Sequence, residues 1–288
     1  MNEPSGPPDQ ATLPPGRRID LPGRGDLFAR DTGPVDDGRP TVVLLHGWSA
    51  TSDLNWLTSY ERLEHHARVV AFDHRGHGRG LRTDERFRLE DAADDVAAVL
   101  DALGIERAIV VGYSMGGAVA QLVWRRHHRR MLGLVLCATA TEFRSSTLEH
   151  LVFASLTPTA ALAKAMPAEL RRQAAVKLMT SRDDREMRRW AVGEVERHDW
   201  RRILEAGSEI GSFTSTRWIG GLDVPVAQVV TLDDKVVSLR RQSALGATIG
   251  DRSLHLVPGG HAVVMEDPAR FAPAFERAVV SVIDRVDA

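Results

Sequence analysis

Six short apolar runs, separated by longer segments with helical spacing, limit the folds open to this chain more than any other feature. Continuous apolar runs, unlike alternating ones, are typical of strands that helices cover on both faces. The runs comprise residues 41–45, 68–72, 108–111, 132–136, 226–230 and 254–257. Strands that alternate with helices predict an α/β fold, in which right-handed crossovers join a mostly parallel sheet and helices flank it.

The segment 89–103 illustrates the helical spacing between two of these runs. Its apolar residues fall at positions 89, 92, 93, 96, 99, 100 and 103, and aspartates occupy much of the remaining face. This spacing predicts an amphipathic helix, and Gly104 is well placed to end it.

The chain of 288 residues is long enough for one large domain that contains an insertion. Residues 1–22 hold six of the fourteen prolines and few large apolar side chains, so we expect a flexible tail. Residues 142–215 favour helices and contain no convincing strand pattern, which predicts an inserted helical cap. The core of the domain then comprises residues 23–141 and 216–288.

The formal net charge of −2 gives no electrostatic field that would hold a nucleic acid or an anionic membrane. Cys137 is the single cysteine, so no internal disulfide can form, which fits a reducing compartment. The N-terminus lacks the apolar run of a signal peptide, and no stretch approaches the roughly 18 consecutive apolar residues of a membrane helix. We therefore expect a cytoplasmic protein without an integral membrane segment, whose partners are small uncharged molecules.

The residues around Ser114 have the G-x-S-x-G pattern of a nucleophile elbow. The pattern follows the apolar run 108–111 and opens a helical segment, which is the strand–turn–helix setting that the motif requires. Gly112 and Gly116 allow the strand and the helix to approach closely, so that the tight turn can lift the serine hydroxyl out of the sheet. We favour Ser114 as the nucleophile over a chance glycine-rich turn.

A serine hydroxyl needs a general base at neutral pH, and His261 is the best placed of the eleven histidines. It follows the last apolar run and a glycine turn, at the carboxyl end of a predicted strand, where parallel sheets gather their ligand sites. His198 lies in a polar helical pattern and is expected to be solvated. His74 and His77 form an H-x-x-H pattern without the Cys, Asp or Glu cluster of a metal site.

The base in turn needs a carboxylate that fixes its tautomer and stabilises the imidazolium. Asp233 and Asp234 both follow the run 226–230, and the order serine, acid, histidine along the chain is the one expected of this fold. From chemistry alone either aspartate can serve, and Glu142 is a more distant third candidate.

Two backbone N–H groups are expected to stabilise the oxyanion that forms during acyl transfer. Met115 supplies one of them, because its N–H is free at the start of the helix that follows the nucleophile. Trp48 supplies the other from the loop after the first apolar run. Gly47 permits an unusual backbone angle, so that the N–H of Trp48 can face the site.

Four blocks of sequence together resemble the α/β-hydrolase superfamily, from about residue 23 to the C-terminus. The blocks are residues 46–48 (HGW), 73–78 (DHRGHG), 112–117 (GYSMGG) and 260–261 (GH). In this superfamily the acid stands four residues before a proline, and Asp234 fits that frame with Ser238 in place of the proline. The resemblance therefore favours Asp234 over Asp233, and it implies that residues 142–215 form the cap.

Ser114 stands where epoxide hydrolases and haloalkane dehalogenases of this fold have aspartate. The resemblance therefore implies a serine hydrolase that cleaves small apolar esters with Ser114, Asp234 and His261, without a metal or an organic cofactor. Three alternatives stay open: transfer to another acceptor such as peroxide, hydrolysis of a carbon–carbon bond, and non-catalytic binding of a small ligand. The apolar stretch at 148–163 either lines an acyl pocket or packs within the cap.

Overall fold

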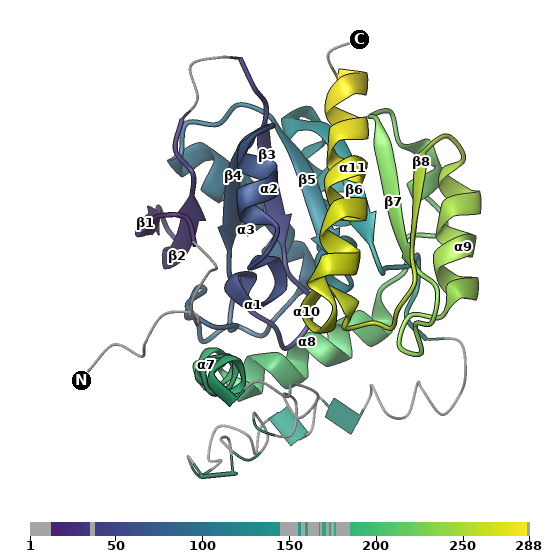
Figure 1. Cartoon of the computed structure of the whole chain (residues 1–288). Coiled ribbons are helices and arrows are strands. Elements are labelled where there is room, and N and C mark those ends of the chain that lie inside the picture. Colours follow the sequence, from purple (N-terminus) through teal and green to yellow (C-terminus); the bar gives the residue numbers. More distant parts are fainter. Residues whose placement is uncertain are drawn as a thin grey trace.

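An eight-stranded sheet forms the centre of the protein, with the strand order β1-β2-β4-β3-β5-β6-β7-β8 (Figure 1). The computed structural model describes residues 13–34, 38–144 and 185–286, and scattered positions between 145 and 184. The strands are β1 (Gly16–Leu21), β2 (Gly25–Asp31), β3 (Thr41–Leu45), β4 (Arg68–Phe72), β5 (Ala108–Tyr113), β6 (Met131–Cys137), β7 (Val226–Thr231) and β8 (Ser253–Val257).

The strands from β3 to β8 run parallel, and each contains one of the six predicted apolar runs. Strand β3 shows why these runs are continuous. Val43 and Leu45 pack into the hydrophobic cluster on one face of the sheet, whereas Val42 and Leu44 pack into the cluster on the other face. Both faces are buried, so no alternate position is left for a polar side chain. The predicted α/β fold with a mostly parallel sheet is confirmed.

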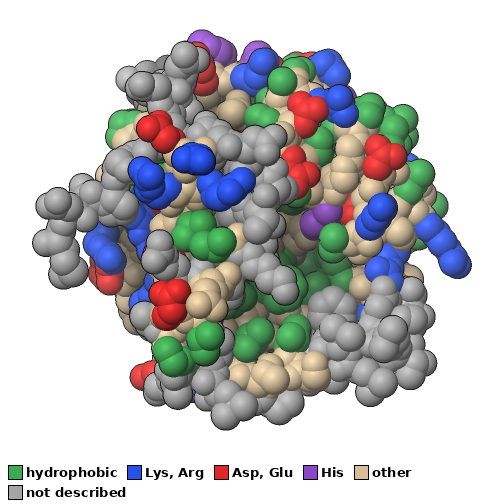
Figure 2. Space-filling model, turned by 60° about the horizontal axis from the view of Figure 1, so that its bottom comes forward, with side chains coloured by type: hydrophobic (Ala, Val, Ile, Leu, Met, Phe, Trp, Pro, Cys, Tyr) green, Lys and Arg blue, Asp and Glu red, His purple; other side chains and the backbone are tan. Residues whose placement is uncertain are grey.

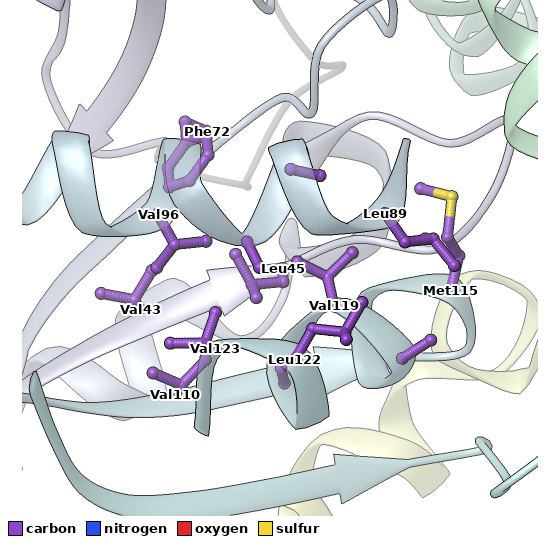
Figure 3. Close-up of a cluster of buried hydrophobic side chains, with 14 of the residues drawn as sticks. Val43, Leu45, Phe72, Leu89, Val96, Val110, Met115, Val119, Leu122 and Val123 are labelled. Carbon is purple, nitrogen blue, oxygen red and sulfur yellow. The ribbon is translucent and has the colours of Figure 1, made fainter. Parts of the chain in front are cut away.

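Helices cover both faces of this sheet. The described helices are α1 (Ser52–Trp56), α2 (Tyr60–Glu64), α3 (Leu89–Ala102), α4 (Met115–His127), α7 (Arg185–Glu196), α8 (Trp200–Ser212), α9 (Leu239–Ile249), α10 (Val263–Glu266) and α11 (Pro268–Val286), with 3-10 turns at His128–Arg130 and Ile219–Gly221. Helices α3 and α4 pack together on one face, and α11 crosses the other face in front of the sheet (Figure 1). Figure 3 shows Val96 of α3 and Val119 of α4 beside Val43 and Val110 of the sheet. The predicted helix at 89–103 is confirmed by α3, and Gly104 follows its end with a φ of 65°.

The prediction of a flexible tail is wrong for residues 16–21, which form strand β1 at the edge of the sheet. β1 pairs antiparallel with β2 through a tight turn that places Gly23 at a φ of 75°. Ile19 and Leu21 are buried, while the residues between and before them are exposed. This hairpin alternates apolar and polar positions because one of its faces meets solvent, so a search for continuous apolar runs misses it. Residues 1–12 lie outside the described part of the chain.

Helices α7 and α8 lie across the carboxyl ends of the parallel strands, at the bottom of Figure 1. The indole N–H of Trp48, in the loop after β3, donates to the carbonyl of Ile203 in α8 at 2.8 Å, which ties this layer to the core. The limits 142–215 for a cap stay a prediction, and most of the apolar stretch at 148–163 lies outside the described residues. Within the described ranges, no helix is both long and apolar enough to cross a membrane.

Candidate active site

Ser114 occupies the tight turn between β5 and α4. Its φ of 53° and ψ of −114° are rare for a residue with a side chain, and such strain gathers at functional sites. The turn is held by the N–H of Ser114, which donates to the carbonyl of Cys137 at 2.9 Å. A Cβ atom on Gly112 would lie 2.2 Å from the carbonyl oxygen of Gly116, and one on Gly116 would lie 2.2 Å from that of Leu45. The two glycines therefore allow the close approach that the sequence predicts.

His261 follows β8 and faces the hydroxyl of Ser114. The distance from its Nε2 to Ser114 Oγ is 2.9 Å, and the distance from its Nδ1 to Asp234 Oδ2 is 2.7 Å. These contacts fix the neutral tautomer, in which Nδ1–H donates to the carboxylate and Nε2 accepts from the serine. Tyr113 also holds this loop, because its hydroxyl donates to the carbonyl of His261 at 2.6 Å. The sequence did not single out Tyr113, since its role depends on a contact 148 residues along the chain.

Asp234 lies in the turn after β7, and its side chain is fully buried. Oδ1 accepts the backbone N–H groups of Val236 and Val237, each at 2.8 Å, and Oδ2 accepts the hydroxyl of Thr231 as well as His261. Burial alone would raise the pKa of Asp234. The hydrogen bond and charge attraction from His261, with the donors around it, outweigh burial and hold this pKa below its ordinary value.

The other two acid candidates point elsewhere. Asp233 is exposed, and its Oδ2 accepts the N–H of Gly259 at 3.1 Å. This hydrogen bond stabilises the turn before His261. Glu142 is exposed and pairs through its backbone with Thr214 in an isolated β-bridge. Neither carboxylate bonds to an imidazole within the described residues. The structure therefore brings Asp234 to His261.

The loop after β3 and the start of α4 meet beside Ser114, where Trp48 and Met115 lie. Neither backbone N–H of these two residues has an acceptor among the described residues, so both remain available for a ligand. Gly47 does not use the positive φ that glycine permits, and the residue with positive φ in this loop is Ser49, at 55°. The N–H of Gly47 instead donates to Oδ1 of Asn55 at 3.0 Å, a contact that no sequence motif indicates.

A pocket of about 290 Å³ opens beside the Ser114 hydroxyl, between the sheet and α8. Most of its walls are apolar or aromatic, as is typical of a site for a small organic ligand. The walls come from Trp48, Tyr113, Phe143, Ile210, Val236, Ala262, Val264 and Met265. Figure 2, which turns this side of the molecule forward, shows hydrophobic side chains in the hollow at its centre.

Four further histidines form a buried cluster next to the loop after β3. They are His46, His74, His77 and His198, and neighbouring ring centroids lie 4.5 to 6.3 Å apart. The expectation that His198 is solvated is wrong: 3% of it is exposed, its Nδ1 accepts the N–H of Gly78, and its Nε2–H donates to the carbonyl of Ser49. In the described part of the chain, no group of three or more His, Cys, Asp or Glu residues is arranged to hold a metal ion.

Comparison with known proteins identifies the family to which the fold belongs. The model of the alpha/beta hydrolase fold family matches residues 40–268. A bifunctional esterase/perhydrolase, DCH, of Acinetobacter calcoaceticus is 42% identical over 93 residues, which are 32% of this chain and 33% of that protein. A putative carbamate hydrolase, RutD, of Agrobacterium fabrum is 28% identical over 251 residues, which are 83% of this chain and 92% of the relative.

Two solved structures share the fold over nearly their whole length. A thermophilic esterase from Thermogutta terrifontis superposes with a TM-score of 0.76 at 23% identity, over 93% of this chain and 99% of that one. The enol-lactonase from Burkholderia xenovorans LB400 gives a TM-score of 0.75 at 22% identity, over 93% of this chain and 100% of that one. Because the family model covers most of the chain and the sheet has the matching topology, this protein belongs to the alpha/beta hydrolase family.

Proposed function

We propose that this protein is a serine hydrolase that cleaves small carboxylic esters through an acyl-enzyme intermediate. One observation supports this above all: Ser114 Oγ lies 2.9 Å from Nε2 of His261, whose Nδ1 lies 2.7 Å from the buried carboxylate of Asp234. A serine hydroxyl is a weak nucleophile at neutral pH, and a base in this position removes its proton as it attacks.

The proposed reaction has two halves. In the first, Ser114 Oγ attacks the ester carbonyl while its proton passes to Nε2 of His261, and the N–H groups of Trp48 and Met115 stabilise the oxyanion. The intermediate collapses, the C–O bond of the ester breaks, and the imidazolium protonates the departing alcohol. In the second half, His261 takes a proton from water, which attacks the acyl carbonyl, and Ser114 regains its proton as the acid leaves. Asp234 keeps its negative charge throughout and stabilises the imidazolium.

The apolar walls of the pocket support a small uncharged ester as substrate, and each step of the proposed reaction uses side chains and backbone groups of this chain. Proteins similar to this one include an esterase and an enol-lactonase, both of which hydrolyse esters. A second candidate, transfer of the acyl group to peroxide, uses the same first half, and the name of the Acinetobacter relative favours it. Product analysis with hydrogen peroxide added to the ester reaction distinguishes the two.

A p-nitrophenyl ester series of increasing acyl length, combined with a fluorophosphonate probe, tests the proposal. We expect turnover of the short esters and covalent labelling at Ser114, located by mass spectrometry of the digested protein. Ser114→Ala should abolish both while the thermal unfolding curve stays unchanged. Turnover that survives Ser114→Ala, or labelling of another residue, would contradict the proposal.

A further inference from the structure

Asn55 lies in the wall of the catalytic pocket, although no motif marks it. It belongs to the short helix α1, only 3% of it is exposed, and it is one of the few polar residues that line the pocket beside Ser114. An amide side chain has one acceptor and one donor group, and in a buried position each is expected to have a partner.

The acceptor of Asn55 has a partner within the protein. Oδ1 accepts the N–H of Gly47 at 3.0 Å, and this bond fixes which end of the amide is oxygen. A Cβ atom on Gly47 would lie 3.5 Å from Cβ of Ser114 and 3.6 Å from Oδ1 of Asn55. The amide oxygen of Asn55 therefore lies near the nucleophile, and its bond to Gly47 positions the loop that presents the N–H of Trp48.

The donor of Asn55 has no partner. Its Nδ2 is buried and finds no acceptor in the described part of the chain. Of the buried polar side-chain atoms that lack a partner there, this is the one that belongs to a residue lining the catalytic pocket. Many of the other side chains that line this pocket, such as those of Ile210 and Val264, are apolar and cannot accept a hydrogen bond. The described residues thus leave Nδ2 without an acceptor, and a molecule in the pocket that Asn55 lines is one that could supply it.

We propose that Asn55 determines specificity, by donating its Nδ2–H to a second oxygen of the substrate near the scissile ester. This inference rests on the proposed ester hydrolysis and narrows its substrate class. The preferred substrates are esters with an ether, hydroxyl or carbonyl oxygen close to the reacting carbonyl, rather than plain hydrocarbon esters. A site built around a buried donor disfavours an analogue that lacks the acceptor, because the donor is then desolvated without a partner.

Two pairs of esters of matched shape test this proposal. p-Nitrophenyl methoxyacetate and p-nitrophenyl butanoate differ by one oxygen in place of a methylene on the acyl side. 2-Methoxyethyl acetate and butyl acetate differ in the same way on the alcohol side, and their hydrolysis is followed by pH titration. For each pair, the ratio of the kcat/KM values is compared between the wild type and Asn55→Leu, so that the intrinsic reactivity of the esters cancels.

We expect Asn55→Leu to lower the ratio of oxygen-containing to hydrocarbon ester by roughly threefold to tenfold in one pair, the value of one neutral hydrogen bond. The pair that responds shows which side of the ester reaches Nδ2. A role limited to positioning Gly47 would instead lower kcat for all four esters equally, and unchanged ratios in both pairs would overturn the proposal. Asn55→Ala gives the same comparison if the leucine variant does not fold.

Val264→Ala is the matched control. It removes part of the same pocket wall without changing a polar atom, so rates can fall while both ratios stay at their wild-type values. The proposed function fails separately: a wild-type protein that hydrolyses none of the four esters and shows no labelling at Ser114 would overturn ester hydrolysis, and this inference with it.

Discussion

Five of the histidines, His261 and the buried cluster of four, occupy two contrasting environments. The side chain of His261 is 21% exposed, and each of its ring nitrogens has a partner that suits proton transfer. The four clustered histidines are at most 3% exposed, and both ring nitrogens of His74 lack a partner among the described residues. Burial lowers the pKa of His46, His74 and His77, and it lowers that of His198 from 6.5 to about 4.

The two environments suit two different roles of histidine: proton transfer at His261 and structural support in the buried cluster. An imidazole that exchanges protons during a reaction needs a carboxylate on one nitrogen and access to substrate on the other. An imidazole that is buried and neutral supplies shape and backbone hydrogen bonds instead, as His198 does for Gly78 and Ser49. The two groups should therefore respond oppositely to substitution and to pH.

The largest expected effect distinguishes the two groups directly. His261→Ala should lower kcat for a p-nitrophenyl ester by about 10⁴- to 10⁶-fold, because the serine loses its base. Its unfolding free energy should change less than that of a variant in the buried cluster, because the side chain is partly exposed and Asp234 keeps its other hydrogen-bond donors. His77→Ala should do the reverse: stability should fall by about 2–4 kcal/mol from the buried cavity, while the folded protein keeps kcat within tenfold. Initial rates and calorimetry on both variants test this prediction. A large loss of kcat in His77→Ala with little loss in His261→Ala would contradict it.

Asp234→Asn should lower kcat by about 10⁴-fold. The amide keeps an acceptor for the backbone N–H groups of Val236 and Val237, so the turn survives, but the imidazolium loses its negative partner. Steady-state kinetics should place the loss in kcat with KM nearly unchanged. A loss of less than about tenfold would mean that another carboxylate orients His261.

The sequence predicts well those features that depend on residues close together in the chain. The six parallel strands, helix α3 and the turn at Ser114 each follow from a local pattern of apolar residues or glycines, although one face of β8 is exposed at Leu254 and Leu256. The hairpin of β1 and β2 was missed because its alternation extends over few residues beside a proline-rich segment.

The features that the sequence could not predict depend on long-range contacts. The neighbours of His198 in the sequence are polar, and this pattern indicates an exposed side chain. In the folded protein His198 is instead buried against the loop of Gly78, 120 residues away in the chain. Asp233 and Asp234 are adjacent and chemically identical, and they differ only in their partners in the loop after β8: Asp233 accepts from Gly259, whereas Asp234 accepts from His261. The sequence does not show these contacts, so only the resemblance to a known motif favours Asp234. Asn55 lies eight residues from Gly47, but a single amide in a helix has no pattern that marks it.

Acid should destabilise the protein through the buried histidines. The unfolded chain binds a proton at the ordinary pKa of 6.5, whereas the folded state holds His198 neutral until about pH 4. The unfolded state therefore binds more protons between these values, and stability is full above pH 6.5 and falls as the pH drops toward 4. This one residue accounts for up to about 3 kcal/mol.

Urea unfolding at pH 8 and at pH 5 measures this effect. His198→Asn should reduce the difference in unfolding free energy between the two pH values, and the other three buried histidines contribute to what remains. His65→Asn is the control, because that side chain is exposed in the folded protein and should leave the difference unchanged. An unaltered difference in His198→Asn would mean that this imidazole is not held neutral by burial.

The smallest expected effect concerns Asp233, the neighbour of the proposed acid. Among the described residues, its exposed carboxylate accepts only the N–H of Gly259, and its own N–H donates to the carbonyl of the same residue. Asp233→Asn keeps a side-chain oxygen that can accept the N–H of Gly259, and it does not change the backbone bond to the carbonyl of Gly259. We therefore expect kcat to stay within about twofold of the wild type. Asp233→Asn and Asp234→Asn are measured on the same ester, and the two variants differ only in which carboxylate loses its charge. Equal losses in the two variants would mean that general electrostatics near the loop, rather than the hydrogen bond to His261, explain the role of the acid.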